Sequence, residues 1–137
     1  MAAVKELIRA EADGSLSFGD YELKAKTKLQ DFNHNGDLYK VKTFKEITKL
    51  ERNELFVYES VPGTAAEHFQ MTADGVEFAA DGTEDAQITL GLEEETEYRV
   101  LVDGVDAGMI KTNRGGKLSL SVELGGKEPV CVKVIKA

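Results

Sequence analysis

The chain has 137 residues and a mass of 15.0 kDa, the size of one domain or two very small ones, and it is long enough to bury a core without disulfides or metal. Seventeen Lys and Arg against twenty-five Asp and Glu give a net charge of −8, which argues against binding nucleic acid or an anionic membrane through a general basic surface. Two His, one Cys and no Trp leave little material for catalysis or metal chelation.

The beginning of the chain has no signal-peptide core, since charge appears by Lys5. No segment approaches the roughly 18 to 20 consecutive apolar residues of a membrane span. We therefore expect a cytoplasmic protein. The single cysteine, Cys131, agrees with a reducing compartment because it cannot form an internal disulfide, and we expect it to face the core or a strand edge.

Short runs in which apolar and polar residues alternate recur about every ten residues, as in all-β sandwiches and barrels. Asp-Gly and Asn-Gly pairs, which tolerate the positive φ of hairpin turns, separate them. The predicted strands are 21–26, 38–42, 55–58, 76–78, 88–90, 98–102, 118–122 and 130–135, and the predicted turns are Asp13-Gly14, Asn35-Gly36, Asp74-Gly75, Asp81-Gly82 and Asp103-Gly104. The sequence therefore predicts an all-β fold.

Residues 43–53 fit two descriptions. They begin with a capping box, Thr43-Phe44-Lys45-Glu46, and apolar residues follow at helical spacing. The same segment also fits a strand through 47–50 that turns at 52–54 and returns through 55–58. The β-rich neighbours favour the strand, but the local pattern leaves both alternatives open.

A Pro-Gly step at Val61-Pro62-Gly63-Thr64 is the candidate internal boundary. Residues 1–60 carry ten basic and eleven acidic side chains, whereas residues 61–137 carry seven and fourteen, so the acidity belongs to the second part. We predict two small β sub-domains, 1–60 and 61–137, packed on each other. The lysines of the first part could pair with the acidic part of a neighbouring copy, which predicts a head-to-tail homo-oligomer.

A corner between two predicted strands has Leu92, Glu94, Thr96 and Tyr98 at every second position. This pattern resembles the strand E to strand F corner of fibronectin type III and other immunoglobulin-like domains, in which proline is usual at the position of Glu94. The resemblance implies an immunoglobulin-like β-sandwich over 61–137. It also implies a tyrosine corner, in which the Tyr98 hydroxyl bonds back to the chain and fixes the crossing between sheets.

The glycine-rich stretch from Tyr98 to Val134 also looks like the non-catalytic β-sandwich appendages of some polysaccharide-degrading enzymes. More loosely, the whole chain resembles small bacterial proteins of clostridial type that carry an endosialidase label. Sialidases hold the substrate carboxylate with several convergent arginines. The arginines of this chain are dispersed among short predicted strands, so the residues do not support that label; they are Arg9, Arg52, Arg99 and Arg114.

One loop resembles the first half of an EF-hand calcium loop. Asp31, Asn33, Asn35 and Asp37 place oxygen ligands at alternate positions around Gly36. The second half does not match, because Lys42 stands where a bidentate Glu would close the shell. A polar hairpin turn explains the same residues, and weak calcium binding is the alternative.

Other candidate sites are sparser. Tyr21, Tyr39, Phe56 and Tyr58 could form a sugar-stacking platform if they share a face, with core packing as the competing explanation. The sequence contains no motif of a nucleophile elbow, a phosphate-binding glycine loop or a His-based metal site. A Ser-His-Asp triad can still form from residues that are far apart in the sequence.

These observations favour a non-catalytic structural or protein-interaction protein over an enzyme, with a carbohydrate-binding module as the alternative function. We expect it to self-associate, or to dock to a protein partner, through its strand edges or sheet faces. The predicted strand 118–122 carries no inward charge that would protect it at a sheet edge.

Overall fold

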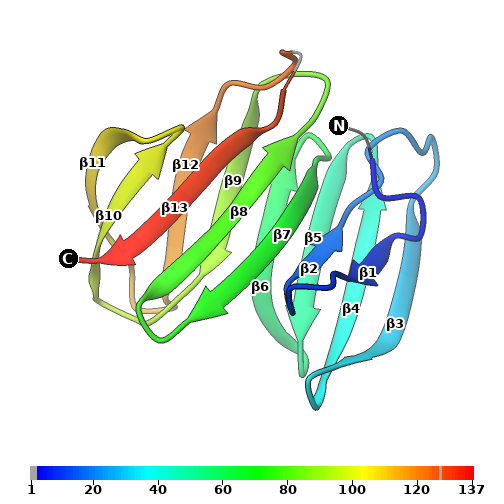
Figure 1. The fold of residues 1–137 in the computed structure, drawn as a ribbon, viewed down its shortest axis with the longest axis horizontal. Coiled ribbons are helices and arrows are strands. Elements are labelled where there is room, and N and C mark those ends of the chain that lie inside the picture. Colours follow the sequence, from blue (N-terminus) through cyan, green and yellow to red (C-terminus); the bar gives the residue numbers. More distant parts are fainter. Residues whose placement is uncertain (1–2, 127) are drawn as a thin grey trace.

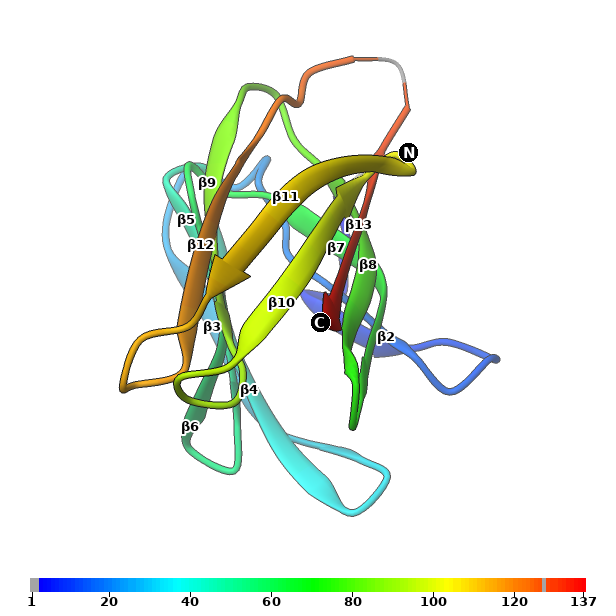
Figure 2. The ribbon, with the colours of Figure 1, turned by 90° about the vertical axis from the view of Figure 1, so that its left-hand side faces the viewer.

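The computed structural model describes residues 3–126 and 128–137, which form thirteen strands in two antiparallel sheets. The sheets lie face to face as the two layers of a sandwich (Figure 1). The view from the side shows both layers nearly edge-on (Figure 2). The predicted all-β sandwich is therefore confirmed.

Each sheet combines strands from early and late in the chain. The seven-stranded sheet has the order β1 (Ile8–Ala10), β2 (Leu16–Phe18), β7 (Ala65–Thr72), β8 (Gly75–Asp81), β13 (Val130–Lys136), β10 (Glu97–Val102) and β11 (Val105–Lys111). The six-stranded sheet has the order β12 (Lys117–Val122), β9 (Ala86–Gly91), β6 (Leu55–Val61), β5 (Ile47–Arg52), β4 (Asp37–Phe44) and β3 (Thr27–His34).

The core lies between the sheets, because alternate residues of the strands point inward. Aromatic rings dominate its centre. The centroid of the Phe18 ring lies 5.1 Å from that of Tyr58, and the Tyr58 centroid lies 5.6 Å from that of Phe78, both pairs edge to face. These rings come from β2, β6 and β8, so one core joins the first and second parts of the chain.

The division into sub-domains 1–60 and 61–137 does not correspond to the sheets. The boundary falls inside β6, which pairs with β9, while β2 pairs with β7. Residues from both ranges form the same hydrophobic cluster. The Pro-Gly step is instead the crossing at which the chain leaves the six-stranded sheet after β6 and enters the seven-stranded sheet at β7.

Several predicted hairpins form as the turn residues require. Asn35 and Gly36 have φ values of 53° and 86°, and Asp103 and Gly104 have values of 50° and 80°, as in type I′ turns. Asp81-Gly82 is an exception, because it begins the crossing from β8 to β9 instead of a hairpin.

Residues 43–53 belong to the β4–β5 hairpin, so the strand alternative was right and the helix was wrong. The predicted strand 21–26 is wrong, because the chain is irregular there and β3 starts at Thr27. The Asp20 carboxylate accepts a hydrogen bond from the Glu22 N–H at 3.1 Å, which favours a turn at the start of this segment.

The expected bond of the tyrosine corner is confirmed. Tyr98 is buried in β10, directly after the chain has crossed from β9 to the other sheet, and its hydroxyl accepts a hydrogen bond from the Glu93 N–H at 3.2 Å. Thr112 reinforces the same corner, since its hydroxyl donates to the Glu93 carbonyl at 2.6 Å and accepts from the Thr96 N–H at 2.9 Å.

Candidate functional site

The predicted calcium ligands lie along a hairpin instead of a closed loop. Asp31 and Asn33 belong to β3, Asn35 forms the turn and Asp37 starts β4. The Asp37 carboxylate already accepts a hydrogen bond from the Asn53 side-chain amide at 3.0 Å. Calcium binding by these residues stays a prediction, and they are spread over two paired strands and their turn, whereas an EF-hand curls its oxygens toward one point.

The four candidate sugar-binding aromatics do not form a platform. Tyr39 and Tyr58 are core residues with 8% and 0% exposure, because their positions on β4 and β6 face inward. The Tyr21 hydroxyl lies 3.4 Å from the Asp81 carboxylate, and burial, together with that carboxylate, raises the pKa of Tyr21 to about 12. Phe56 lies under the Lys117 ammonium, which is 4.8 Å from the ring centroid.

Asp13, Ser15 and His68 meet beside β2 and β7, which brings the residue types of a hydrolytic triad together. The His68 Nδ1 atom lies 3.1 Å from the Asp13 carboxylate and 3.3 Å from the Ser15 hydroxyl. A triad needs the carboxylate and the nucleophile on opposite ring nitrogens, so that the base can relay a proton. Because both groups share one nitrogen, this cluster lacks the relay geometry.

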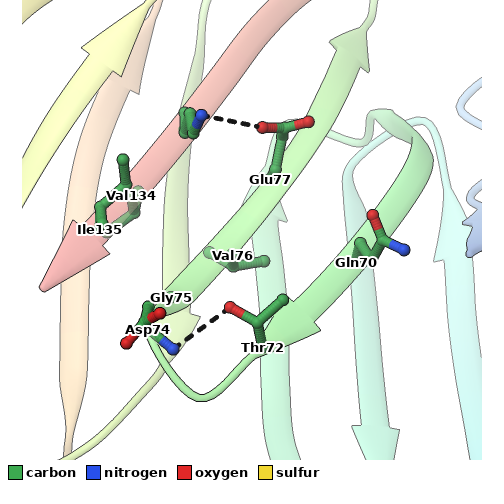
Figure 3. A pocket seen from close by; sticks show the side chains of 9 residues that line it. Gln70, Thr72, Asp74, Gly75, Val76, Glu77, Val134 and Ile135 are labelled. Carbon is green, nitrogen blue, oxygen red and sulfur yellow. Dashed lines mark hydrogen bonds and ion pairs between the residues drawn. The ribbon is translucent and has the colours of Figure 1, made fainter.

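A shallow depression of about 310 Å³ lies over β7, β8 and β13 (Figure 3). Its polar groups bond to one another: Glu77 pairs with Lys133 at 3.6 Å, and the Thr72 hydroxyl accepts from the Asp74 N–H at 3.2 Å.

Cys131 is exposed on the same outer face as Lys133, because residues two apart on a strand share a face. Our expectation that Cys131 faces the core or a strand edge was therefore wrong.

The arginines occupy separate elements and do not converge. Arg9 on β1 pairs with Glu11, and Arg99 on β10 pairs with Asp106. Arg52 ends β5, and Arg114 lies in the turn between β11 and β12.

A row of lysines crosses the outer face of the six-stranded sheet. Lys28, Lys42 and Lys49 stand directly opposite one another on β3, β4 and β5. Within the described residues, none of the three forms an ion pair. Like charges in this arrangement repel, so the row lowers the stability of the free sheet.

The unpaired sheet edges differ in how well they are protected. β1 has three residues, and β3 is interrupted by a bulge between Leu29 and Phe32. β11 is bulged opposite Val100 and Leu101, and the Gly108 N–H, with Arg99, holds the pKa of Asp106 below its ordinary value at that bulge. Bulges and edge charges are the devices by which proteins block strand addition.

The remaining edge strand, β12, is regular throughout. Each of its six residues pairs with a residue of β9, from Lys117 opposite Gly91 to Val122 opposite Ala86, with no bulge. Within the described part of the chain, β9 is the only strand that pairs with β12. On the other side, the Lys117 N–H and C=O are bonded to Asn113 at 3.0 and 3.3 Å, so the unpaired edge of β12 begins at Ser119. We take this edge, together with the neighbouring edge of β11, as the candidate site and name it the β11–β12 side.

Local contacts hold β12 firmly in place. The Asn113 side-chain oxygen accepts hydrogen bonds from the N–H groups of Gly115 and Lys117 at 2.8 and 3.0 Å, which fixes the start of the strand. Leu118, Leu120 and Val122 point into the core with 1%, 8% and 1% exposure. Outward-facing serines bond to β9, with Ser119 Oγ 2.9 Å from Thr89 Oγ1 and Ser121 Oγ donating to Gln87 at 2.7 Å.

β11, the edge strand of the other sheet on this side, carries exposed apolar side chains, of which Met109 stands opposite Arg99 on the outer face of its sheet. Val105 and Met109 are 69% and 46% exposed, and β11 is largely exposed along its length. Figure 2 faces this side of the molecule and shows β11 and β12 running along it. The opposite side is bridged, since the ring Nε2 of His34 lies 3.0 Å from the Gly14 carbonyl oxygen.

Within residues 3–126 and 128–137, no three His, Cys, Asp or Glu side chains gather as a metal-binding group. The described part of the chain contains no helix with the length and apolar character needed to cross a membrane. Comparison with known proteins gave no match to a family model, to a curated protein or to a solved structure.

Proposed function

We propose that this protein is a non-catalytic structural or interaction protein that binds a second copy of itself through the β11–β12 side. The observation that carries this proposal is the free edge of β12, which is unbulged, pairs with β9 along its length and is open from Ser119 onward. A strand of this kind offers a row of N–H and C=O groups to another strand.

Two finer expectations belong to the same proposal. The Tyr98 corner supports an immunoglobulin-like character for the second part of the chain, in which such corners fix the crossing between sheets. The exposed free thiol of Cys131 supports a reducing, cytoplasmic setting, because exposed thiols oxidise readily elsewhere.

The proposal is tested by measuring molar mass with light scattering over a series of protein concentrations. We expect the mass to rise toward that of a dimer. The variant Ser119→Lys with Ser121→Lys places charges along the free edge and should stay monomeric. Its matched control is Thr89→Lys with Gln87→Lys, which adds the same charges on the same face at the directly opposite positions of β9.

The control variant should still associate, because β9 lies inside the sheet. A wild-type protein that remains monomeric throughout the series contradicts the proposal. Equal loss of association in both variants would mean that the sheet face, and not the β12 edge, makes the contact.

A further inference from the structure

We infer that two copies of this chain join β12 to β12 about a two-fold axis through Leu120, with Lys117 of each copy opposite Glu123 of the other. This inference rests on the proposed self-association and adds its register and its ion pairs. It follows from the alternation of β12, from the charges at its two ends and from the pairing rules of antiparallel strands.

Alternation restricts where the axis can lie. Residues directly opposite each other in an antiparallel pair point to the same face. Odd-numbered residues of β12 point outward and even-numbered residues point into the core. In a pair of identical strands, the inward-facing side chains of both copies lie on the same face of the joined sheet only if the two-fold axis passes through a residue. An axis between two residues would place inward-facing side chains opposite outward-facing ones.

The charges at the two ends of β12 then favour one of the registers in which the axis passes through a residue. With the axis at Leu120, Lys117 lies opposite Glu123 of the second copy, and this contact occurs twice. Ser119 lies opposite Ser121 of the second copy, and Leu118 lies opposite Val122 of the second copy. With the axis one residue earlier, at Ser119, Lys117 would meet Ser121 of the second copy, and the two charged ends would find no partner.

Both charged ends are available for this contact. The side chains of Lys117 and Glu123 are exposed, and neither forms an ion pair with a described residue. Because Asn113 already bonds the Lys117 N–H and C=O, the contact at this end is made by side chains, and the backbone bonds between the copies join Ser119 to Ser121. The Lys117 ammonium is held over the Phe56 ring on the outer face, so its position does not depend on the second copy. Glu123 directly follows Val122, the last residue of β12, whose side chain is buried.

The experiment mixes two charge-reversed variants, Lys117→Glu and Glu123→Lys. Each variant alone would place like charges opposite each other twice, so its dimer dissociation constant should rise about tenfold. In the mixed dimer, both contacts join opposite charges again, so the equimolar mixture should form heterodimers with nearly the wild-type constant. Native mass spectrometry distinguishes the heterodimer from both homodimers.

Matched controls make the same charge changes away from β12. Lys24→Glu and Glu128→Lys, at exposed loop positions, should leave the dimer constant unchanged and should show no preference for heterodimers. Thermal unfolding of each variant checks that the fold is intact, because all four positions are exposed.

Disulfide mapping tests the register independently, in a Cys131→Ser background. An oxidised mixture of Ser119→Cys and Ser121→Cys proteins should cross-link to a heterodimer, whereas each protein alone should cross-link weakly. Strong self-cross-linking of Ser119→Cys would place the axis at Ser119 and overturn the inference.

The outcomes separate this inference from the proposed function. If the wild type associates but the two charge reversals have no effect and show no heterodimer preference, the register is wrong and self-association stands. If the wild type stays monomeric at every concentration, both are wrong.

Discussion

Replacing Thr64 by valine tests how the core is held together where the chain crosses between sheets. The Thr64 hydroxyl lies 2.7 Å from the Tyr58 hydroxyl and 2.7 Å from the Ser60 hydroxyl, and all three side chains are buried. Among the described residues, Thr64 is the side-chain partner of both. Valine has nearly the shape of threonine, so Thr64→Val removes the hydrogen bonds without leaving a cavity.

The magnitude follows from the two hydroxyls that lose their partner. A buried polar group without a hydrogen bond costs about 1–3 kcal/mol, so with two such groups the variant should lose about 2–6 kcal/mol of unfolding free energy. For a chain of this length, that is a fall in Tm of about 8–24 °C. Burial raises the pKa of Tyr58 to about 12, so its hydroxyl keeps its proton and the expected loss does not change between neutral and mildly basic pH.

The assay is urea and thermal unfolding of three variants in parallel. Tyr58→Phe should cost about 1 kcal/mol, because Thr64 keeps its bond to Ser60. Thr27→Val makes the same substitution at an exposed strand position and should change stability by less than about 0.5 kcal/mol. A loss for Thr64→Val no larger than that for Thr27→Val would refute the reasoning.

Three further predictions concern other parts of the fold. Burial raises the pKa of Glu67, whose Oε1 has no hydrogen-bond partner among the described residues, so the unfolded chain gives up this proton at lower pH than the folded protein does. Glu67→Gln should therefore stabilise by about 1 kcal/mol at neutral pH and by almost nothing near pH 3 in urea unfolding, and a gain equal at both pH values would contradict this sign. Lys42→Glu should stabilise by about 0.5 kcal/mol at low salt, because it places an acid between two lysines, and the gain should vanish in about 1 M NaCl; a salt-independent gain would argue against the charge row. Gly75→Ala should lower the unfolding free energy by about 3 kcal/mol or more, because a Cβ would lie 1.8 Å from the Val134 carbonyl oxygen, whereas Gly126→Ala, which meets open space, should be nearly neutral in the same thermal assay.

The elements that could be predicted from the sequence are those whose conformation depends on residues close together in the chain. Asn35-Gly36 and Asp103-Gly104 form hairpin turns because their backbone tolerates positive φ at both positions. The strands at 38–42 and 118–122 were predictable from strict alternation, since one face of each is buried. The tyrosine corner was predictable from spacing, because the hydroxyl reaches back a fixed short distance along the chain.

Long-range pairing could not be predicted from the same patterns. The Pro-Gly step after Val61 has the composition of a domain linker, but tertiary pairing of β6 with β9 makes it a crossing within one sandwich. The alternation at 21–26 resembles a strand, yet the Asp20 side chain favours a turn there. The lysine row depends on the registers of three strands, which no single segment specifies.

Only one property of the candidate site could be predicted from the sequence, because its other properties depend on long-range strand pairing. An unprotected strand at 118–122 could be recognised from the absence of inward charge. Its place at the edge of a sheet, and the bulges that protect the competing edges β3 and β11, are properties of the assembled sheets. The importance of Lys117 and Glu123 follows only once β12 is known to be an edge strand.

Hydrogen exchange measured at low and high protein concentration tests the central claim most directly. If β12 pairs with β12 of a second copy, the edge-facing amides of Ser119, Ser121 and Glu123 should exchange more slowly at high concentration. The amides of β3 at the opposite side should exchange at the same rate at both concentrations. Exchange in β12 that is independent of concentration, or slowing that is centred on β3 instead, would contradict the claim that the β12 edge joins two copies.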